Sequence, residues 1–447
     1  MTRRDDTIAA VATPAGAGGV GVIRVSGPLA STIGQQLSGK KLQPRRVRFS
    51  TLRDADATTL DRGLCVYFKA PASFTGEDVL ELHAHGSPVV LDLLLKRIYA
   101  LGAQPARPGE FSERAFLNGK LDLVQAEAVA DLIASGSEAA ARAALRSLDG
   151  AFSQQVNEVL DALVRLRVRL EGALDFPEEE IDFLSEPQLK NDLAALQART
   201  TQLLGATRSG VVLRDGLHVV IVGRPNVGKS SLLNALAQSE RAIVTAIPGT
   251  TRDLLRESVQ LDGIGLTLVD TAGLRASEDE IEREGIRRAQ AELQRADVAI
   301  LVTESSHVDG DAMLLDACSV GATRLVVHNK IDLTGEAAHV QRAERAVHIY
   351  LSAQRGDGLA DLRSELSRLA MPGDATQGTF SARTRHVLAL EIVVQHLDAA
   401  VGQLESGAGE LVAEELRHAQ RSLGEITGVH SNEDLLGAIF STFCIGK

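Results

Sequence analysis

The sequence has no tryptophan and only three cysteines, which are Cys65, Cys318 and Cys444. The cysteines lie far apart and belong to no CxxC pair or histidine cluster, which excludes a disulfide framework and a zinc site and indicates a reducing compartment. No uninterrupted apolar run approaches the roughly 18 residues that a membrane helix needs. The first residues, MTRRDDTIAAVATPAG, also lack the apolar stretch of a secretory signal. We therefore expect a cytoplasmic protein without a membrane span.

An excess of positive charge is also absent, because 47 Lys and Arg residues stand against 59 Asp and Glu residues and give a net charge of −12. This balance argues against a protein coated in positive charge for gripping nucleic acid. A nucleic-acid substrate would need a local basic patch or a partner protein. The length of 447 residues predicts about two to four domains.

Three patterns follow one another along the chain. Residues 1–118 mix β-rich runs such as GVGVIRVSG with the helical run PVVLDLLLKRIYALG, which predicts an α+β domain. Residues 119–213 are rich in Ala and Leu at a spacing near 3.6 and predict long packed helices. Residues 214–372 alternate strand and helix patterns as a parallel α/β domain does, and residues 373–447 are helical again. The simplest arrangement is an α/β domain inserted into a helical domain, which requires only that the two ends of the inserted domain lie close together.

The segment GRPNVGKSS fits the phosphate-binding pattern G-x-x-x-x-G-K-[ST] from Gly223 to Ser230. The apolar run VVIV precedes it and the helix-like SLLNALAQ follows it, so the pattern has the strand–loop–helix context that it needs. Its glycines let backbone amides turn toward phosphates. Lys229 places a positive charge near the β- and γ-phosphates, and Ser230 offers a hydroxyl to Mg²⁺. The segment therefore predicts a nucleotide site at the start of a helix.

Three further motifs identify the nucleotide as GTP rather than ATP. In NKID, which ends an apolar strand, Asp332 can accept from the N1–H and 2-amino groups of guanine, which adenine lacks, and Asn329 ties this loop to the phosphate loop. In DTAG, Asp270 would hold Mg²⁺ through water, and the Gly273 N–H would sense the γ-phosphate. The segment LSA, residues 351–353, suits the loop over the base.

The residue after DTAG is Leu274, although Ras-type enzymes have a Gln there that orients the attacking water. The PGTT core of TAIPGTTRD is typical of a switch loop with Thr251 on Mg²⁺. Asn226 could give its amide oxygen to a monovalent cation that lies where an arginine finger would otherwise place its charge. Rival sources of that charge are Arg224, Arg252 and Arg275. Polar residues shortly after Leu274 are candidates for the role of the missing Gln, although most of them fit a solvated loop better.

Together with these motifs, the N-terminal ATPAGAGGVGVIRVSG, the central RPGEFSERAFLNGKLDLVQAEAVADLI and the terminal FCIGK make the chain similar, nearly end to end, to the MnmE (TrmE) family of tRNA modification GTPases. The resemblance implies a homodimer whose subunit has an N-terminal tetrahydrofolate-binding and dimerisation domain, a helical domain and an inserted Ras-like P-loop GTPase domain. It implies GTP hydrolysis with Mg²⁺, activated by K⁺ when two G domains dimerise across the nucleotides.

The resemblance also implies a partner, the FAD-containing MnmG, in a heterotetramer that acts on tRNA. With it, such proteins add an aminomethyl or carboxymethylaminomethyl group at C5 of the wobble uridine. The carbon comes from a one-carbon tetrahydrofolate, of which 5-formyl-tetrahydrofolate is an analogue.

Carried over onto this sequence, the resemblance assigns roles to particular residues. Glu282 would orient the attacking water through a bridging water, because a carboxylate in direct contact with phosphates would be repelled, and Lys229 would be the second catalytic residue. The K⁺ ligands would be Asn226, Thr245, Ile247 and Thr250, and the Mg²⁺ ligands Ser230 and Thr251. The folate contacts would be Arg24, Glu81, Lys120 and Lys447. The GTP-binding residues would be Asn226, Val227, Gly228, Lys229, Ser230, Ser231, Thr245, Ala246, Ile247, Pro248, Gly249, Thr250, Thr251, Asp270, Thr271, Ala272, Gly273, Asn329, Lys330, Ile331, Asp332, Ser352 and Ala353.

Alternative interpretations exist for the histidine pair, for Cys444 and for the function of the protein. His83 and His85 would share one face of a strand like a metal pair, but without a third ligand a structural role is favoured. Cys444 is interpreted as a small packed residue near the folate pocket rather than a reactive thiol, because no base stands beside it. The alternative function is a regulatory or ribosome-assembly GTPase switch, which the G-domain motifs fit equally well. The N-terminal block and FCIGK favour tRNA modification.

Overall fold

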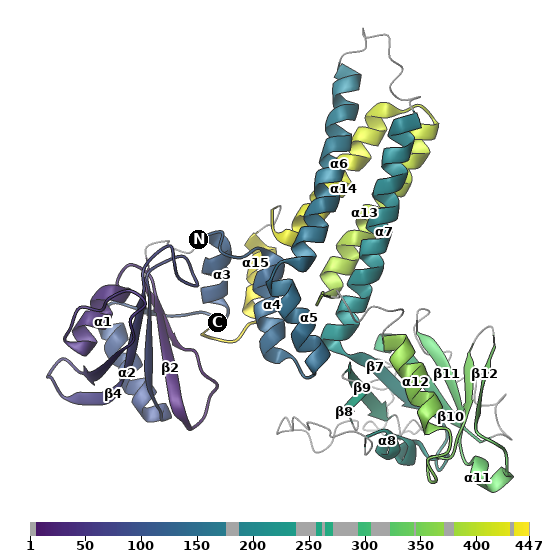
Figure 1. Cartoon of the computed structure of the whole chain (residues 1–447), viewed down its shortest axis with the longest axis horizontal. Coiled ribbons are helices and arrows are strands. Elements are labelled where there is room, and N and C mark those ends of the chain that lie inside the picture. The colour runs from purple at the N-terminus through teal and green to yellow at the C-terminus, as the bar shows by residue number, and fades with distance from the viewer. Residues whose placement is uncertain are drawn as a thin grey trace, which may run out of the picture. The chain divides into compact units, whose positions relative to one another are not determined.

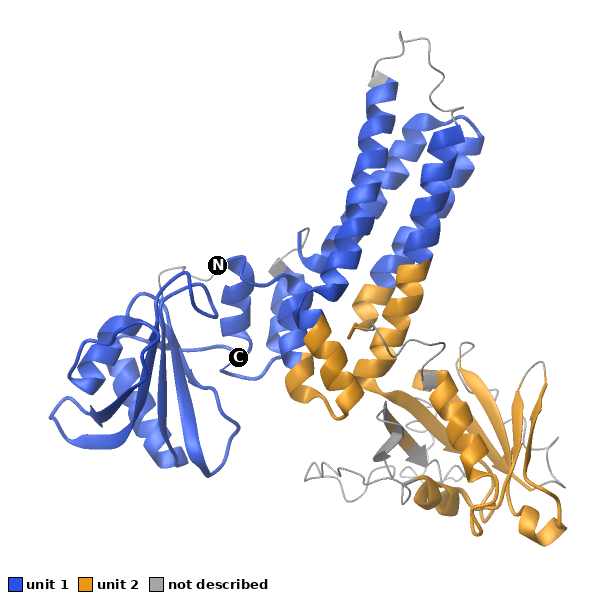
Figure 2. Ribbon diagram, viewed as in Figure 1, with its two compact units in different colours: residues 1–130, 147–201, 388–447 blue, residues 131–146, 202–387 orange. Residues whose placement is uncertain are grey.

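The computed structural model describes residues 6–175, 187–237, 256–261, 264–270, 294–304, 322–343, 346–370, 380–429 and 433–446. The chain forms two compact units, each built from separate stretches of sequence (Figure 2). Unit 1 contains residues 1–130, 147–201 and 388–447, and unit 2 contains residues 131–146 and 202–387. The boundaries expected from the sequence, after residues 118, 213 and 372, are finer than this division and stay predictions.

Unit 1 begins with a six-stranded sheet of order β3-β4-β5-β2-β1-β6 (Figure 1). Its neighbouring strands are antiparallel except for β1 with β6. Helices α1 (Ala30–Ser38) and α2 (Pro88–Ala100) share an apolar core with one face of the sheet. The α+β expectation for the N-terminal region is therefore confirmed. The strands are β1 (Ile8–Val11), β2 (Gly18–Ser26), β3 (Arg48–Arg53), β4 (Thr59–Phe68), β5 (Val79–Gly86) and β6 (Gln104–Pro105).

The long helices bury residues at intervals of three and four, which is the spacing that the sequence predicts. In α6 (Ala151–Asp175), which packs against α14 (Gly409–Thr427), these residues are Val156, Val159, Leu163, Leu166 and Leu170. The helical expectation for this part of the chain is confirmed. The other helices outside the α/β region are α3 (Glu110–Leu117), α4 (Leu123–Ala134), α5 (Glu138–Leu148), α7 (Pro187–Asp215), α13 (Thr384–Glu405) and α15 (Glu433–Ser441).

Helix α13 is, among the described residues, the one helix that is long and apolar enough to cross a membrane by length and composition alone. The same helix buries a stripe made of Leu390, Val393, Leu397, Ala400 and Leu404. Such a stripe is what a core helix of a helical bundle also shows, so the composition of α13 is weak evidence for a membrane span.

Unit 2 contains a seven-stranded sheet of order β12-β13-β11-β10-β7-β9-β8 (Figure 1). The five central strands are parallel, and the edge strands β8 and β12 are antiparallel to their neighbours. Alternate residues of the strands enter two apolar clusters on opposite faces, one of which includes α8 (Lys229–Ala237) and α12 (Leu359–Ala370). The parallel α/β expectation is confirmed, whereas β12 was not expected. The strands are β7 (Leu217–Val222), β8 (Arg256–Leu261), β9 (Ile264–Asp270), β10 (Val298–Thr303), β11 (Thr323–His328), β12 (His339–Arg342) and β13 (Val347–Tyr350).

The two connections that flank the α/β part of unit 2 lie side by side. The Ala382 N–H donates to the Gly210 carbonyl of α7 at 3.2 Å. Asp131 Oδ1 in α4 accepts from Arg214 Nε and from Arg383 Nη2, each at 2.8 Å. One buried carboxylate therefore joins the segment that leads into the α/β part to the segment that leads out of it. This proximity is what an inserted domain requires.

Candidate functional site

The phosphate loop, residues 223–230, leaves the carboxyl end of β7 and enters the first turn of α8. At β7 the strand order reverses, because the chain continues to β8 and β9 on one side and then to β10 on the other. Ligands of open α/β sheets bind outside the carboxyl ends of the strands at such a switch point. The fold therefore brings the predicted nucleotide loop to the edge where a ligand is expected.

The backbone and the lysine of this loop are held in specific positions. Gly228 has a φ of +98°, and a Cβ at this residue would lie 2.2 Å from Asn329 Nδ2, so only glycine fits. Asn226 has a φ of +66°, a left-handed conformation that Asn tolerates better than most residues. Lys229 is 6% exposed, and its Nζ donates to two carbonyl oxygens of the loop at 2.8 and 2.9 Å. The lysine charge is therefore kept beside the backbone that would surround phosphates.

The Asn329 side chain connects three of the predicted motifs. Its Nδ2 donates to the Val227 carbonyl at 2.9 Å, and its Oδ1 accepts from the Ala353 N–H at 3.0 Å. Asn329 is buried, so water competes little for either hydrogen bond. The NKID segment is thus joined to the phosphate loop, as the sequence predicts, and also to the LSA segment, which sequence reasoning missed.

Asp332, the predicted guanine-specificity residue, lies in the short helix α11 (Ile331–Thr334). Its Oδ1 accepts from the Ser352 hydroxyl at 2.6 Å. Ser352 is fully buried, and its Oγ also accepts from the Arg355 N–H at 3.2 Å. A hydroxyl that is fixed in this way orients the carboxylate while leaving acceptor capacity on Asp332 for a ligand.

Lys330 approaches the phosphate loop from the same segment. Its Nζ donates to the Asn226 carbonyl at 2.7 Å and pairs with Glu304 Oε1 at 2.6 Å. This contact adds a second link between NKID and the loop. Among the other predicted GTP-binding residues that the structure describes, Val227 and Ile331 are buried, whereas Ser230 and Ser231 are both exposed in the first turn of α8.

Asp270 is the last residue of β9, and the parallel register pairs it with Ile221 of β7. Because the carboxyl ends of parallel strands meet at one edge of a sheet, Asp270 and the phosphate loop share that edge. The other predicted residues of this region lie outside the described residues: Thr245, Ala246, Ile247, Pro248, Gly249, Thr250, Thr251, Arg252, Thr271, Ala272, Gly273, Arg275 and Glu282.

Aromatic and histidine rings of β12, β13 and β11 stack on one another and support the strand that leads to NKID. No sequence motif predicted this stack. The rings of His328 and Tyr350 lie 4.1 Å apart with an angle of 5°, and those of His339 and Tyr350 lie 4.1 Å apart with an angle of 10°. His328 Nε2 is also 3.0 Å from His348 Nδ1. Burial, together with the neighbouring His348 and His339, lowers the pKa of His328 to about 4. His328 is therefore neutral near pH 7.

We expect the stability of unit 2 to fall as the pH is lowered from about 6.5 toward 4, and His328→Phe to remove part of this fall. An unfolded histidine has a pKa near 6.5, whereas that of folded His328 is about 4. Between these values the unfolded state binds more protons, so stability rises with pH there, and His328 adds no slope above or below that window. Phe can keep the stacking on Tyr350 but loses the contact with His348, so the proton is read from how the stability difference between the two proteins changes with pH. Thermal unfolding of both proteins across this range measures it, and parallel curves would contradict the expectation.

The predicted folate residues Arg24 and Glu81 lie opposite each other on β2 and β5. Arg24 Nε donates to Glu81 Oε1 at 3.0 Å, and the side chains are 22% and 20% exposed. Their strand neighbours belong to the core shared with α1 and α2, so this pair lies on the other face of the sheet. The Arg24 guanidinium is 5.2 Å from the ring centroid of Phe74 and 5.7 Å from that of Phe111. A charged pair bordered by aromatic rings suits a flat ligand with hydrogen-bonding edges.

Lys120 lies against the loop that carries Phe74. Its Nζ donates to the Pro71 carbonyl at 3.2 Å. The segment 443–446 reaches the same sheet, because a Cβ on Gly446 would lie only 2.3 Å from the Val11 carbonyl oxygen at the end of β1. Unit 1 thus brings Lys120 and the FCIGK segment to the sheet that carries the Arg24 pair. Lys447 lies outside the described residues.

His83 and His85 share one face of β5, as expected, but each has its own carboxylate neighbour. His83 Nε2 is 3.6 Å from Glu81 Oε2, and His85 Nδ1 is 2.8 Å from Asp61 Oδ1. No three His, Cys, Asp or Glu side chains form a group that could hold a metal ion in the ranges that the structure describes. Each histidine thus has a carboxylate neighbour of its own. The structural role that the sequence favours stays a prediction.

The expectation of a packed Cys444 is wrong. Cys444 is exposed, whereas Phe443 and Gly446 are buried on either side of it. The carbonyl of Cys444 accepts from the Gly109 N–H at 3.4 Å. The segment is held by its backbone and by Phe443, so its packing does not require the thiol to be buried.

Known proteins that are similar to this chain match it over its whole length. Residues 123–444 match the family described as MnmE helical domain, and residues 7–120 match GTP-binding protein TrmE N-terminus. A tRNA modification GTPase MnmE of Azoarcus sp. (strain BH72) is 53% identical over 448 residues, covering 100% of this chain and 99% of its own. Proteins of the same name from Xanthomonas campestris pv. campestris (strain B100) and from Photobacterium profundum are 54% and 50% identical and cover 100% of both chains. With matches of this extent and identity, the chain belongs to the MnmE family, also called TrmE.

Proposed function

We propose that this protein is a GTP hydrolase that acts in tRNA modification. Relatives named tRNA modification GTPase, 50% to 54% identical over the full chain, support the proposal. The structural observation that carries it is the Asn329 side chain, which joins the phosphate loop at Val227 to the segment of Ala353. The parts that would hold the phosphates and the guanine base are thereby connected into one site.

In the proposed reaction a water molecule attacks the γ-phosphorus of GTP, and GDP and phosphate leave. The chain contributes by positioning GTP and by stabilising charge. Backbone amides of residues 223–230 and the N-terminus of α8 would face the phosphates. Lys229, which the loop carbonyls already hold in place, would gain a stronger charge-assisted partner in a phosphate oxygen.

The described residues fit Mg²⁺, a cation that prefers oxygen ligands. Ser230 offers its hydroxyl from the first turn of α8, and Asp270 ends the neighbouring strand β9. Thr251, outside the described residues, would add a second hydroxyl. When bound, Mg²⁺ would neutralise charge on the β- and γ-phosphates.

We assign the orientation of the attacking water to Glu282, through a bridging water, because Leu274 cannot perform it. The additional positive charge would come from K⁺ when the G domains of a homodimer meet across their nucleotides. Asn226 would be a ligand of K⁺, since it is exposed on the loop in a left-handed conformation and its carbonyl is fixed by Lys330. The other proposed K⁺ ligands are Thr245, Ile247 and Thr250.

GTP turnover should be at least about tenfold faster in KCl than in NaCl of equal ionic strength. The charge of an arginine finger is worth about 10³ to 10⁵ in rate, so a cation at the same place can exceed tenfold. Equal ionic strength keeps the screening of charges the same in both salts. Equal rates in the two salts would show that K⁺ does not supply the additional positive charge. Arg224, Arg252 and Arg275 would then be the candidates for supplying it. The absence of any preference for GTP over ATP would contradict the proposed hydrolase itself.

For the modification reaction we propose a cytoplasmic homodimer that works with the FAD-containing MnmG in a heterotetramer. The complex would add a (carboxymethyl)aminomethyl group at C5 of the wobble uridine, with carbon from a one-carbon tetrahydrofolate. Arg24, Glu81, Lys120 and Lys447 would contact the folate. The Arg24 pair beside Phe74 supports this assignment, because Arg and Lys suit the folate carboxylates and a glutamate suits the N–H donors of the pterin.

Nucleoside analysis of tRNA from cells that lack this protein separates the two candidate functions. The proposal expects the C5 group to be missing from the wobble uridine, and restoration by a plasmid copy of the gene is the control. Normal modification in the deletion strain would favour a regulatory or ribosome-assembly switch.

A further inference from the structure

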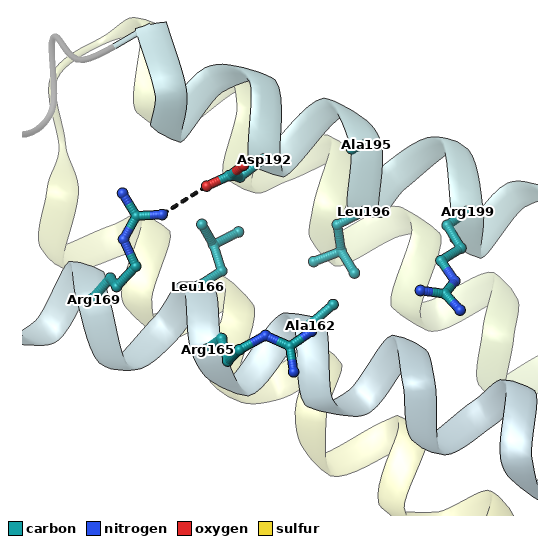
Figure 3. Close-up of a pocket in the computed structure, with 8 residues that line it drawn as sticks. All are labelled: Ala162, Arg165, Leu166, Arg169, Asp192, Ala195, Leu196 and Arg199. Carbon is teal, nitrogen blue, oxygen red and sulfur yellow. Dashed lines mark hydrogen bonds and ion pairs between the residues drawn. The ribbon is translucent and has the colours of Figure 1, made fainter.

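A groove between α6 and α7 in unit 1 gathers arginines in a chain that is otherwise acidic (Figure 3). Arg165 and Arg169 stand one turn apart on α6, and Arg199 stands on α7. The whole chain has 12 more acidic than basic residues, so a cluster of guanidinium groups on one surface is not what its average composition provides. None of the nucleotide or folate roles above uses these residues.

We propose that this groove binds the phosphodiester backbone of tRNA. The inference rests on the proposed function in tRNA modification and adds to it the surface that meets the substrate. A protein of net negative charge needs such a local basic patch to approach a polyanion. Arginine is suited to the role, because its planar guanidinium donates two parallel hydrogen bonds to a phosphate.

Two of the three guanidinium groups in the groove, those of Arg165 and Arg199, are the most accessible to a phosphate. In the part of the chain that the structure describes, no ion-pair or hydrogen-bond partner accompanies the exposed guanidinium of Arg165. Arg169 pairs with Asp192 at 2.7 Å, and Arg199 pairs with Glu158. Both pairs are exposed, with side-chain exposures from 34% to 47%. Exposed pairs of this kind contribute little stability, so exchanging the Glu158 carboxylate for a phosphate costs Arg199 little.

The shape of the groove also suits a backbone rather than a small ligand. Leu166 and Leu196 are buried between the helices, and the small Ala162 and Ala195 line the groove between the arginines (Figure 3). Four residues at a rise of 1.5 Å separate Arg165 from Arg169 by about 6 Å along α6. Arg165 and Arg169 therefore follow one another along the groove, where a continuous polyanionic strand can meet both guanidinium groups.

The test is binding of fluorescently labelled tRNA to the full chain, measured by anisotropy over a series of KCl concentrations. Arg165→Gln should weaken binding about fivefold and lower the slope of log affinity against log salt by about one, because one phosphate contact is lost. Arg165→Gln with Arg199→Gln should weaken it further. The matched control is Arg417→Gln, since Arg417 is an exposed arginine of α14 that pairs with Glu414 at 2.6 Å. The control should keep the affinity and slope of the unchanged protein.

Three results would overturn the proposal. The first is a double variant with unchanged tRNA affinity and salt slope. The second is an unchanged protein that binds no tRNA. The third is a double variant that keeps its tRNA affinity but no longer co-elutes with MnmG, which would assign the groove to a protein partner. GTP turnover without tRNA, measured on the same preparations, should not change. If the unchanged protein itself hydrolysed no GTP, that result would count against the proposed hydrolase and not against the groove.

Discussion

Asp332→Asn should weaken GTP binding by about a hundredfold or more while the protein stays folded. The Ser352 hydroxyl donates to Asp332 Oδ1, so an asparagine would turn its oxygen to Ser352 and its NH₂ group toward the base. Two donors of guanine would then face a donor instead of a carboxylate. Hydrogen bonds to charged groups contribute about 1.5–3 kcal/mol each, and tenfold in affinity corresponds to about 1.4 kcal/mol.

Titration calorimetry with GTP and with xanthosine triphosphate measures this change. Xanthine carries a carbonyl where guanine carries the 2-amino group, so the variant should prefer the xanthine nucleotide. Glu336→Gln is the matched control, because Glu336 is an exposed carboxylate four residues further along the chain, and its GTP affinity should stay unchanged. If Asp332→Asn bound GTP as tightly as the unchanged protein, Asp332 would not be the residue that reads the base.

Asp131→Ala should destabilise unit 2 by about 3 kcal/mol, the lower end of the range for breaking a buried ion pair by removing one partner. Asp131 has a side chain only 6% exposed and pairs with Arg214 and Arg383, whose side chains are 29% and 16% exposed. Without the carboxylate, two partly buried guanidinium groups lose their shared partner. The partial exposure of both arginines keeps the expected cost from being higher.

Urea unfolding followed by circular dichroism measures the loss of stability, and hydrogen exchange locates it. We expect faster exchange of the Ser381 and Ala382 amides, which donate to Ala143 and Gly210 in the neighbouring helices. Glu414→Ala is the control, because it removes an exposed ion pair with Arg417 and should cost far less stability than Asp131→Ala. Equal effects of the two substitutions would show that the buried carboxylate does not hold the two connections together.

The local sequence pattern was sufficient to predict most of the helices and strands and the position of the nucleotide loop. The apolar run before Gly223 became β7, and the run after it became α8, because strand and helix periodicity and the glycine turn are properties of adjacent residues. Asp332 followed from its place after an apolar strand. Arg24 and Glu81 came only from family resemblance, because no local pattern marks two residues as cross-strand neighbours.

Contacts between distant segments were beyond the sequence. The ring stack of His328, Tyr350 and His339 depends on β12 adding to the sheet edge, and β12 carries only exposed residues and no strand pattern. Cys444 was expected to be packed, yet it is its neighbour Phe443 that is buried. Which residue of a short segment faces inward depends on the surface that receives it.

By itself, the sequence determined the α+β, helical and α/β regions, the phosphate loop and the family. These follow from periodicity, from glycine and proline chemistry and from motifs a few residues long, all of which act over short distances along the chain. Only the tertiary structure decided that Asn329 holds two loops at once, that Asp131 joins both connections of the α/β part, and that three arginines meet in one groove. Each of these depends on side chains that are far apart in sequence and are brought within hydrogen-bond or helix-packing distance only when the chain has folded.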